Sequence, residues 1–383
     1  MAYRIQRNVV ATAVLLCLLT YLSVPRLLRG QGQTEADARL SRWRPTRELA
    51  NVGYVGNAVC AKCHASEAAN FFATPMANAL KASSDCELLA RRPRMTFREG
   101  PYLYRIDRQG ARATYTVSEG ANSISTPILY CFGQGVAGQT YVFQREGSLY
   151  ESRVSYFQEL QGLNITILHP RSVPTSLESA LGRRISAEGA DGCFNCHSTG
   201  ALRGGQLRLD QLTPGVGCEA CHGPGQRHLA AVKAKQRDNL QIFDPRNLDS
   251  LDLTQEFCGA CHMSFEQAML MPDRGGINNL RFQPYRIFSS RGHLQNDPRV
   301  KCTACHDPHD KLKHEASFYD PKCLACHVSD KQARTETRSA PSCPIARARC
   351  VECHMPKVEV PEMHFQFTDH WIRIVKTNEA VPR

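Results

Sequence analysis

The chain has 383 residues, 18 of them cysteine, and a formal net charge of +11 at neutral pH. The length allows two or three domains, and so many cysteines point to disulfides, metal sites or a covalently bound cofactor. The hydrophobic content of 42% is typical of a globular chain and argues against a disordered or membrane-embedded protein.

The first 32 residues have the composition of an export signal. Arg4 and Arg7 precede an uncharged run over residues 9–24. This run is shorter than the stretch of about 20 apolar residues that crosses a membrane, and no small-residue cleavage site follows it. Two interpretations stay open: a signal peptide, which we favour, or a retained anchor formed by residues 9–24. Either way, we expect an exported chain in the periplasm or at the cell surface.

The pattern Cys-x-x-Cys-His occurs seven times and uses fourteen of the eighteen cysteines. Cysteines at i and i+3 lie on one side of a helical turn, so both sulfurs can bond the vinyl groups of one haem. The histidine at i+4 then places its imidazole under the iron. Zinc sites and disulfides also use paired cysteines, but neither needs a histidine after every pair. The pattern therefore predicts seven covalently bound c-type haems.

The motifs define two sets of predicted haem-binding residues. The predicted thioether cysteines are Cys60, Cys63, Cys193, Cys196, Cys218, Cys221, Cys258, Cys261, Cys302, Cys305, Cys323, Cys326, Cys350 and Cys353. The predicted proximal iron ligands are His64, His197, His222, His262, His306, His327 and His354.

The sixth ligand of each iron decides between electron transfer and catalysis. Seven histidines lie outside the motifs, and one of them, His314, is not among our candidates. A histidine close in sequence to its own proximal ligand cannot easily reach the opposite face of that haem, but it can reach a neighbouring one. The candidate distal ligands are His228, His309, His293, His370, His169, His364 and Met76. Met76 is either a ligand or a core residue among Phe71, Phe72 and Leu80.

Residues 33–94 form a predicted N-terminal segment with the first haem site, and residues 95–168 have a different character. Short runs of alternating polar and apolar residues follow one another there, with turn residues at Gly100-Pro101, Gly110 and Gly147. This pattern predicts an antiparallel β-rich insert between the first and second haem motifs. The insert could cover the first haem, dock a partner or brace the structure.

Residues 169–383 are predicted to form a six-haem cytochrome c domain with a C-terminal tail. Its motifs follow one another at intervals of 25, 40, 44, 21 and 27 residues. Such intervals leave little room for an independent protein core, so the haems themselves would form the apolar interior. The predicted fold class is a mainly α, haem-packed multihaem cytochrome c with extensive loops, interrupted by the β insert.

Three cysteines remain outside the motifs and the leader, namely Cys86, Cys131 and Cys343, and Cys17 lies in the leader. An odd number in an oxidising compartment allows one disulfide and one free thiol. Buried free cysteines are the commoner case, and the sequence assigns these residues no function.

Several stretches resemble the multihaem cytochromes c related to hydroxylamine oxidoreductase and to the tetrahaem cytochrome c of ammonia oxidisers. The stretches are YVGNAVCAKCH, GVGCEACHGPGQRH, CTACHDPH and CVECHMP. The resemblance covers about residues 54–80 and 190–372. It implies that His228, after C-H-G-P-G, and His309, after C-H-x-P, are axial ligands of packed haems. Family members often carry a histidine where this chain has Met76, and the tetrahaem relatives do not account for the β insert.

The function that these features predict is electron relay through closely packed, mostly six-coordinate haems. Two alternatives stay open: a multihaem oxidoreductase acting on a small nitrogen or sulfur compound at one open haem, and a subunit of a larger haem assembly. The C-x-x-C-K site of the pentahaem nitrite reductases does not occur in this sequence, and we predict no catalytic residues.

The predicted partners are redox proteins, with possible membrane association through the N-terminus. A nucleic-acid partner is not expected, although the chain is basic. Residues 1–32 contain four arginines and no acidic residue, so the rest of the chain carries a net charge of +7. Its Lys and Arg residues are scattered singly and would pair with haem propionates.

Overall fold

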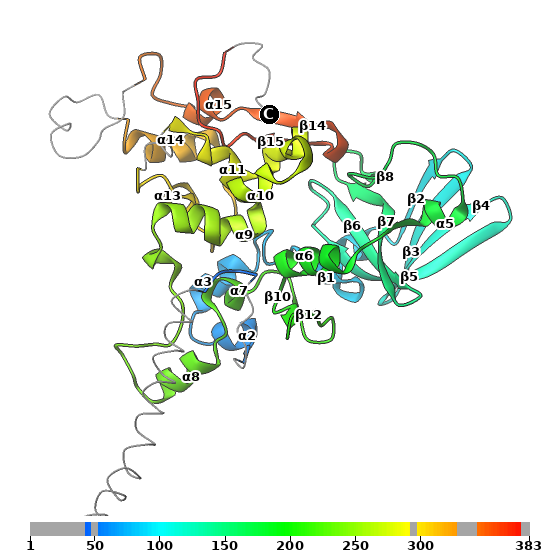
Figure 1. The fold of residues 1–383 in the computed structure, drawn as a ribbon, viewed down its shortest axis with the longest axis horizontal. Helices are drawn as coiled ribbons and strands as arrows, with labels where there is room; N and C mark the ends of the chain where they lie inside the picture. Colours follow the sequence, from blue (N-terminus) through cyan, green and yellow to red (C-terminus); the bar gives the residue numbers. More distant parts are fainter. Residues whose placement is uncertain (1–42, 47–52, 292–296, 328–342, 377–383) are drawn as a thin grey trace, which may run out of the picture.

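The computed structural model describes residues 43–46, 53–291, 297–327 and 343–376. In these ranges a curled antiparallel sheet lies beside a group of short helices (Figure 1). The predicted export signal or anchor, and the candidate ligand His293, lie outside these ranges. Within them, no helix has both the length and the apolar character that crossing a membrane requires.

The sheet has nine strands, seven of which follow one another in the order β2-β3-β4-β5-β6-β7-β8, while β1 pairs with β5 and β9 with β7. The strands are β1 (Leu80–Ala82), β2 (Arg94–Glu99), β3 (Tyr102–Gln109), β4 (Arg112–Glu119), β5 (Asn122–Phe132), β6 (Gln139–Arg145), β7 (Ser148–Phe157), β8 (Gly162–Ile165) and β9 (Gly182–Arg184). Strands β2 and β8 also lie side by side, so the sheet curls back toward itself.

Alternation of buried and exposed side chains explains why these segments form strands. In β3, Tyr102, Tyr104 and Ile106 are buried while the residues between them are not. The inner face of the curled sheet is therefore filled largely by aromatic and branched side chains. The turn glycines predicted from the sequence are confirmed: Gly100 and Gly110 have positive φ between paired strands.

The prediction of a mainly α fold is wrong. The described residues are about 35% helical and 25% strand, and the sheet is the largest single element. It extends from β1 to β9, over residues 80–184, and so exceeds the stretch 95–168 that the sequence pattern marked. Strands of three residues are too short to show the alternation from which strands are predicted, which explains why β1 and β9 were missed.

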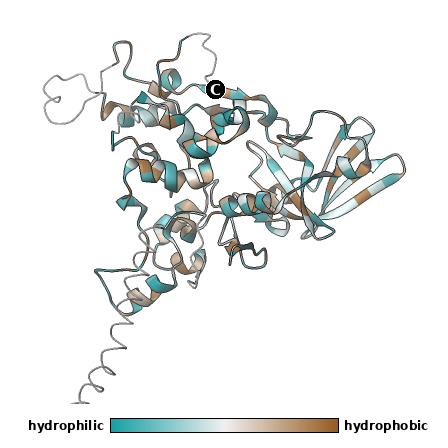
Figure 2. Cartoon of the chain, in the orientation of Figure 1, coloured by the Kyte–Doolittle hydropathy of each residue, from teal (hydrophilic) through white to brown (hydrophobic). Residues whose placement is uncertain are grey.

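The helices are short, and those that carry a Cys-x-x-Cys-His motif need only one helical turn for it. They are α2 (Asn57–Cys60), α3 (Ala65–Phe71), α4 (Glu87–Arg91), α5 (Leu177–Leu181), α6 (Ala187–His197), α7 (Cys218–His222), α8 (Gln226–Lys233), α9 (Gly259–His262), α10 (Phe265–Met269), α11 (Gln283–Phe288), α13 (Cys302–Cys305), α14 (Ala316–Leu324) and α15 (Cys350–His354). Hydrophobic and hydrophilic residues stand side by side along them (Figure 2).

Further short elements connect these helices. Three single-turn 3-10 helices are η1 (Ser83–Asp85), η2 (Pro245–Asn247) and η6 (Pro361–Met363). The 3-10 segment η4 (Pro272–Arg281) is longer and is kinked near its start, and η3 (Asp252–Cys258) is a π-helix that leads into the fourth motif. Small hairpins pair β10 (Ser198–Thr199) with β13 (Thr213–Pro214), β11 (Leu202–Arg203) with β12 (Gln206–Leu207), and β14 (Lys357–Val360) with β15 (Phe365–Thr368).

Helix α6 joins the helical group to the sheet. Phe194, in the second haem motif, is fully buried and packs with Leu80 of β1 and Val142 of β6. Its ring also meets the rings of Tyr130 and Phe132 edge-on, with centroids 5.2 and 5.1 Å away. The sheet therefore fixes the position of the second haem motif, and with it His197.

Candidate haem-binding site

The backbone of the motifs has the helical geometry that haem attachment needs. In three motifs the histidine N–H donates to the carbonyl of the first cysteine, as in His64 to Cys60 and His306 to Cys302, both at 3.0 Å, and His327 to Cys323 at 3.1 Å. This i to i+4 bond closes one turn of helix. Both cysteines and the histidine of such a motif therefore emerge from the same turn.

Three pairs of histidine rings face each other across motifs. The pairs are His64 with His228, His222 with His309, and His306 with His370, with ring centroids 6.4, 6.0 and 6.2 Å apart. Two imidazoles bonded to opposite sides of one iron at about 2 Å each have ring centres about 6 Å apart. The ring spacing of each pair therefore matches that of two ligands of one iron. In each pair the second histidine comes from outside the motif that supplies the first.

Hydrogen bonds orient several of these rings. The Nδ1 atoms of five histidines lie within hydrogen-bonding distance of backbone carbonyl oxygens: His197 of Ala79 (3.3 Å), His222 of Phe243 (3.0 Å), His228 of Leu240 (2.7 Å), His354 of Arg373 (2.8 Å) and His370 of Thr368 (3.0 Å). A ring whose Nδ1–H donates to a carbonyl keeps a lone pair on Nε2, and metal-binding histidines are commonly held in this way. The arrangement thus prepares Nε2 for an iron.

Burial keeps four of the motif histidines and His370 uncharged. Removal from water lowers the pKa of His197, His222, His262 and His306, and lowers that of His370 to about 4. Only a neutral imidazole can bind a metal. At neutral pH these side chains are therefore in the protonation state that iron ligation requires.

Two candidate distal ligands lie elsewhere, against the sheet. The Nε2 atom of His169 is 3.1 Å from Oε2 of Glu151. The Nε2 atom of His364 is 3.0 Å from Nδ2 of Asn164, and its ring meets that of Phe157. The structure does not bring either ring opposite a motif histidine, because both Nε2 atoms contact side chains of the sheet.

The last candidate, Met76, is half-buried, and its carbonyl oxygen accepts the N–H of Val216 at 3.1 Å. The segment around Met76 therefore packs against the loop before the third motif. At that loop, Gly215 has a φ of 80°, and a Cβ atom there would meet the carbonyl oxygen of Ala77 at 2.0 Å. Only glycine allows this close approach of the two segments.

Cysteines of different motifs also lie next to each other. Four pairs of thiols are close enough to shift the pKa of one another, namely Cys60 with Cys218, Cys196 with Cys261, Cys258 with Cys302, and Cys323 with Cys350. The first motif is thus next to the third, the second to the fourth, the fourth to the fifth, and the sixth to the seventh. Electrostatic contacts of Cys221 with Cys258, and of Cys305 with Cys326, join the third motif to the fourth and the fifth to the sixth. The seven motifs therefore form one connected group.

A carboxylate that sequence reasoning missed lies inside the third motif. Glu219 is 3% exposed, and its side chain accepts the backbone N–H groups of Val55, Gly56 and Gly225, each at 2.8 Å. It thereby ties together the loop before the first motif, the third motif and the turn that leads to His228. In the sequence, only its position between two motif cysteines marked this residue, and the other six motifs carry different residues at the same position.

We expect the Glu219→Ala variant to be destabilised by about 3 kcal/mol, since three backbone donors would lose a charged acceptor. The midpoint of chemical denaturation, followed by circular dichroism, measures this loss. Glu352 is a matched control because it lies inside the seventh motif but is exposed and paired with Arg349. Equal midpoints for Glu219→Ala and Glu352→Ala would contradict the structural role of Glu219.

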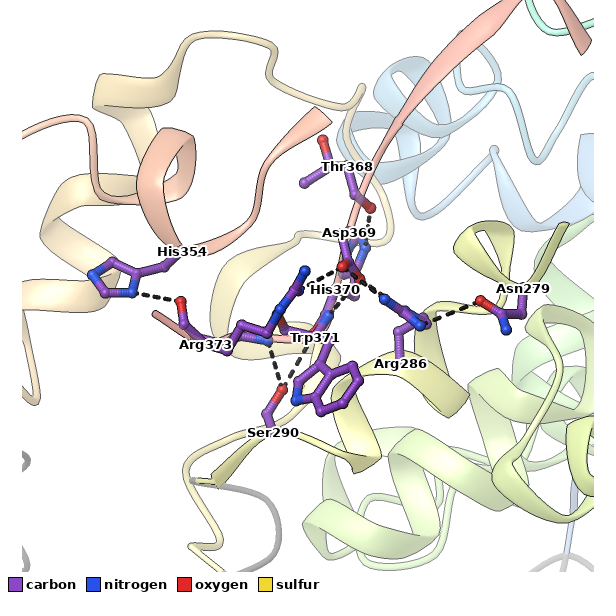
Figure 3. A network of polar contacts seen from close by, with 10 residues as sticks. Asn279, Arg286, Ser290, His354, Thr368, Asp369, His370, Trp371 and Arg373 are labelled. Atoms are coloured by element: carbon purple, nitrogen blue, oxygen red, sulfur yellow. Dashed lines mark hydrogen bonds and ion pairs between the residues drawn. The ribbon is translucent and has the colours of Figure 1, made fainter. Parts of the chain in front are cut away.

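A second buried carboxylate, Asp369, organises the surroundings of two haem motifs (Figure 3). Its oxygens accept from Nε and Nη2 of Arg286 at 2.8 and 2.7 Å, from the N–H of Trp371 at 3.0 Å and from Nη1 of Arg373 at 2.6 Å. His370 is the next residue, and the carbonyl of Arg373 orients His354. Asp369 therefore holds the backbone that positions His370, whose ring lies opposite His306, and the backbone that orients His354 in the seventh motif.

The pKa of Asp369 reflects these contacts. Burial raises the pKa of its carboxyl, but the hydrogen bonds from Arg286, Trp371 and Arg373 outweigh burial and lower the pKa below its ordinary value. The group is therefore ionised at neutral pH, although it is fully buried with Arg286.

Comparisons with known proteins agree with a haem-binding chain. Residues 168–223 match the family model described as cytochrome c554 and c-prime. The chain is 23% identical over 226 residues to the multiheme cytochrome MtrA of Shewanella baltica (strain OS185), covering 55% of this chain and 58% of that protein. It is 33% identical over 88 residues to cytochrome c-554 of Nitrosomonas europaea, covering 19% of this chain and 35% of that protein.

The chain therefore spans about half or less of the length of these relatives. No solved structure gives a significant match. The expected resemblance to multihaem cytochromes c is confirmed by the two relatives and the family model.

Proposed function

We propose that this chain, a relative of the multihaem cytochromes c, is a seven-haem electron carrier of the periplasm or cell surface. The observation that carries the proposal is the set of three facing histidine pairs, each spaced to hold one iron on both sides. An iron with two histidine ligands has no open position for a substrate, which favours electron transfer over catalysis.

When bound, c-type haems supply one-electron transfer. The chain would contribute covalent attachment through the fourteen motif cysteines and one axial ligand through each motif histidine. We assign His228, His309 and His370 as the distal partners of His64, His222 and His306. Met76 then remains a packing residue, because His228 faces His64.

The contacts between motifs support a relay. The attachment sites follow one another in the order first, third, fourth, fifth, sixth and seventh, and the second site lies beside the fourth. Neighbouring sites therefore share a boundary throughout, without a stretch of protein core between them.

The proposed partners are redox proteins of the same compartment, which would give electrons to one end of this series of sites and take them from the other. The relative named multiheme cytochrome MtrA supports a place in such a chain of carriers. The export signal or anchor in residues 1–32 would bring the protein there and, if retained, attach it to the membrane.

Two measurements on the purified protein test the proposal. Intact-mass spectrometry should show seven covalently attached haems, and the electron paramagnetic resonance (EPR) spectrum of the ferric protein should be dominated by low-spin signals. Fewer than seven haems would contradict the assignment of the motifs. A stoichiometric high-spin signal would instead favour the multihaem oxidoreductase, whose open iron would accept a small nitrogen or sulfur compound. A stable complex with other haem proteins after purification would favour the assembly subunit.

A further inference from the structure

Two of the cysteines outside the haem motifs meet inside the sheet unit. Cys86 precedes α4, and Cys131 lies on β5, opposite Lys81 of β1. They are 1% and 0% exposed and lie in the same buried cluster. The Cys86 sulfur is 3.2 Å from Oε1 of Gln139 on β6, two residues before Tyr141, which is the strand partner of Cys131. Neither residue belongs to a Cys-x-x-Cys-His motif, so neither has a haem to bond.

We propose that Cys86 and Cys131 form a disulfide in the mature protein. A disulfide can join two cysteines whose Cα atoms lie within about 7 Å of each other, and this buried corner of the sheet brings Cys86 and Cys131 together. The bond would close a loop from α4 to β5 in the part of the chain that contains no haem motif. The proposal goes beyond electron relay, and it rests on the proposed export only because an oxidising compartment preserves disulfides.

The two thiols have different environments in the folded chain. The interaction with Cys131 lowers the pKa of the Cys86 thiol to about 7, whereas the interaction with Cys86 and burial raise the pKa of Cys131. Gln139 Oε1, 3.2 Å from the Cys86 sulfur, adds a second polar contact.

The oxidant would be the disulfide of an exported thiol oxidase, acting before the sheet closes over the pair. The Cys86 thiolate attacks one oxidant sulfur and releases the other as a thiol, which leaves a mixed disulfide. The Cys131 thiolate then attacks the Cys86 sulfur and releases the second oxidant thiol. Two protein thiols are oxidised and one oxidant disulfide is reduced to a dithiol, so electrons and protons balance.

The bond would fasten a connection between the sheet and a haem motif. Residues 79–86 run through β1 and η1 to Cys86. At the start of this segment, the carbonyl oxygen of Ala79 accepts the N–H of Gly133 and lies 3.3 Å from Nδ1 of His197. Arg108 already holds the far end, because its Nη1 donates to the carbonyls of Ser83 and Cys86, both at 3.0 Å. A covalent bond at Cys86 would anchor that end permanently.

Differential alkylation of the full exported haem protein tests the proposal. The denatured protein is treated with one alkylating reagent, then reduced and treated with an isotopically heavy form of it, and its peptides are analysed by mass spectrometry. We expect the light label on Cys343, which is exposed, and the heavy label on Cys86 and Cys131. An intact linked peptide should appear without reduction. The light label on all three cysteines would overturn the proposal.

Single variants distinguish a disulfide between Cys86 and Cys131 from a pair of free thiols. In Cys86→Ser, the disulfide predicts that Cys131 changes from the heavy to the light label, whereas a pair of free thiols predicts no change at Cys131. Cys343→Ser is the matched control and should leave the labels on Cys86 and Cys131 unchanged. Haem number and spin state are read separately from the labels, so a failed disulfide is distinguishable from a failed electron-relay assignment.

Discussion

Replacing His309 with alanine is expected to leave one iron without its sixth ligand and to add a high-spin signal equal to one haem in the ferric EPR spectrum. His309 faces His222 with a ring separation of 6.0 Å and ring planes 9° apart. No change in haem number is expected, because His309 lies outside the attachment motif. The intact mass should therefore differ from that of the parent protein only by the substitution.

Two further variants separate ligation from a structural role. His314→Ala, five residues away in the same loop, should leave the spectrum low-spin, since its ring faces no motif histidine in the described structure. His309→Met should also stay low-spin but raise one reduction potential, because methionine is an iron ligand that favours the reduced state. An unchanged spectrum for His309→Ala would contradict the pairing of His309 with His222.

The second large effect is expected at Asp369. In Asp369→Ala, the guanidinium of Arg286 would remain buried without its partner, and we expect a loss of about 3–5 kcal/mol in the free energy of unfolding. Chemical denaturation at pH 7, followed by circular dichroism, measures it. Because Asp369 also holds the backbone around His370 and Arg373, a new high-spin component should accompany the loss.

The pH dependence provides a check on the same pair. A carboxyl whose pKa is lowered in the folded state stabilises the protein above its unfolded pKa of about 3.9 and loses that contribution as the pH falls further. The difference in stability between the parent and Asp369→Ala should therefore be constant from pH 7 to pH 5 and shrink below about pH 4.

The double variant Arg286→Met/Asp369→Leu is expected to lose less stability than Asp369→Ala, because it leaves no buried charge without a partner. The control Asp310→Ala removes an exposed carboxylate that pairs with Lys313 and should barely move the midpoint. A midpoint for Asp369→Ala close to that of Asp310→Ala would contradict the importance of the buried pair.

The haem-binding residues could be predicted from the sequence because their spacing is set by local geometry. A cysteine pair followed by a histidine needs one helical turn, and the bond from His306 N–H to Cys302 shows that turn. The short stretches between motifs predict that distal histidines serve neighbouring motifs, and the ring spacings of His228 with His64 and of His309 with His222 agree with this prediction. These ligand assignments stay predictions until the haem protein is measured.

Other features depend on contacts between distant segments and left no local pattern. Glu219 gains its role from the backbone N–H groups of Val55 and Gly56, which lie 164 and 163 residues earlier in the chain. Asp320, which accepts the N–H groups of Arg349 and Cys350 and so joins α14 to α15, is equally inconspicuous in the sequence. The sheet was underestimated because strands such as β1 become recognisable only through their pairing partner.

The thiol contacts between motifs also have a consequence for biogenesis. Cys196 lies against Cys261, and Cys258 against Cys302, in the folded chain. An oxidising compartment would join such neighbours as readily as it joins Cys86 to Cys131, and each wrong bond would permanently block two attachment sites. If the proposed haems and export are correct, haem attachment would have to outpace folding, and the cell would have to keep these thiols reduced until each has its cofactor. The yield of mature protein would then be set by that competition rather than by the stability of the finished fold.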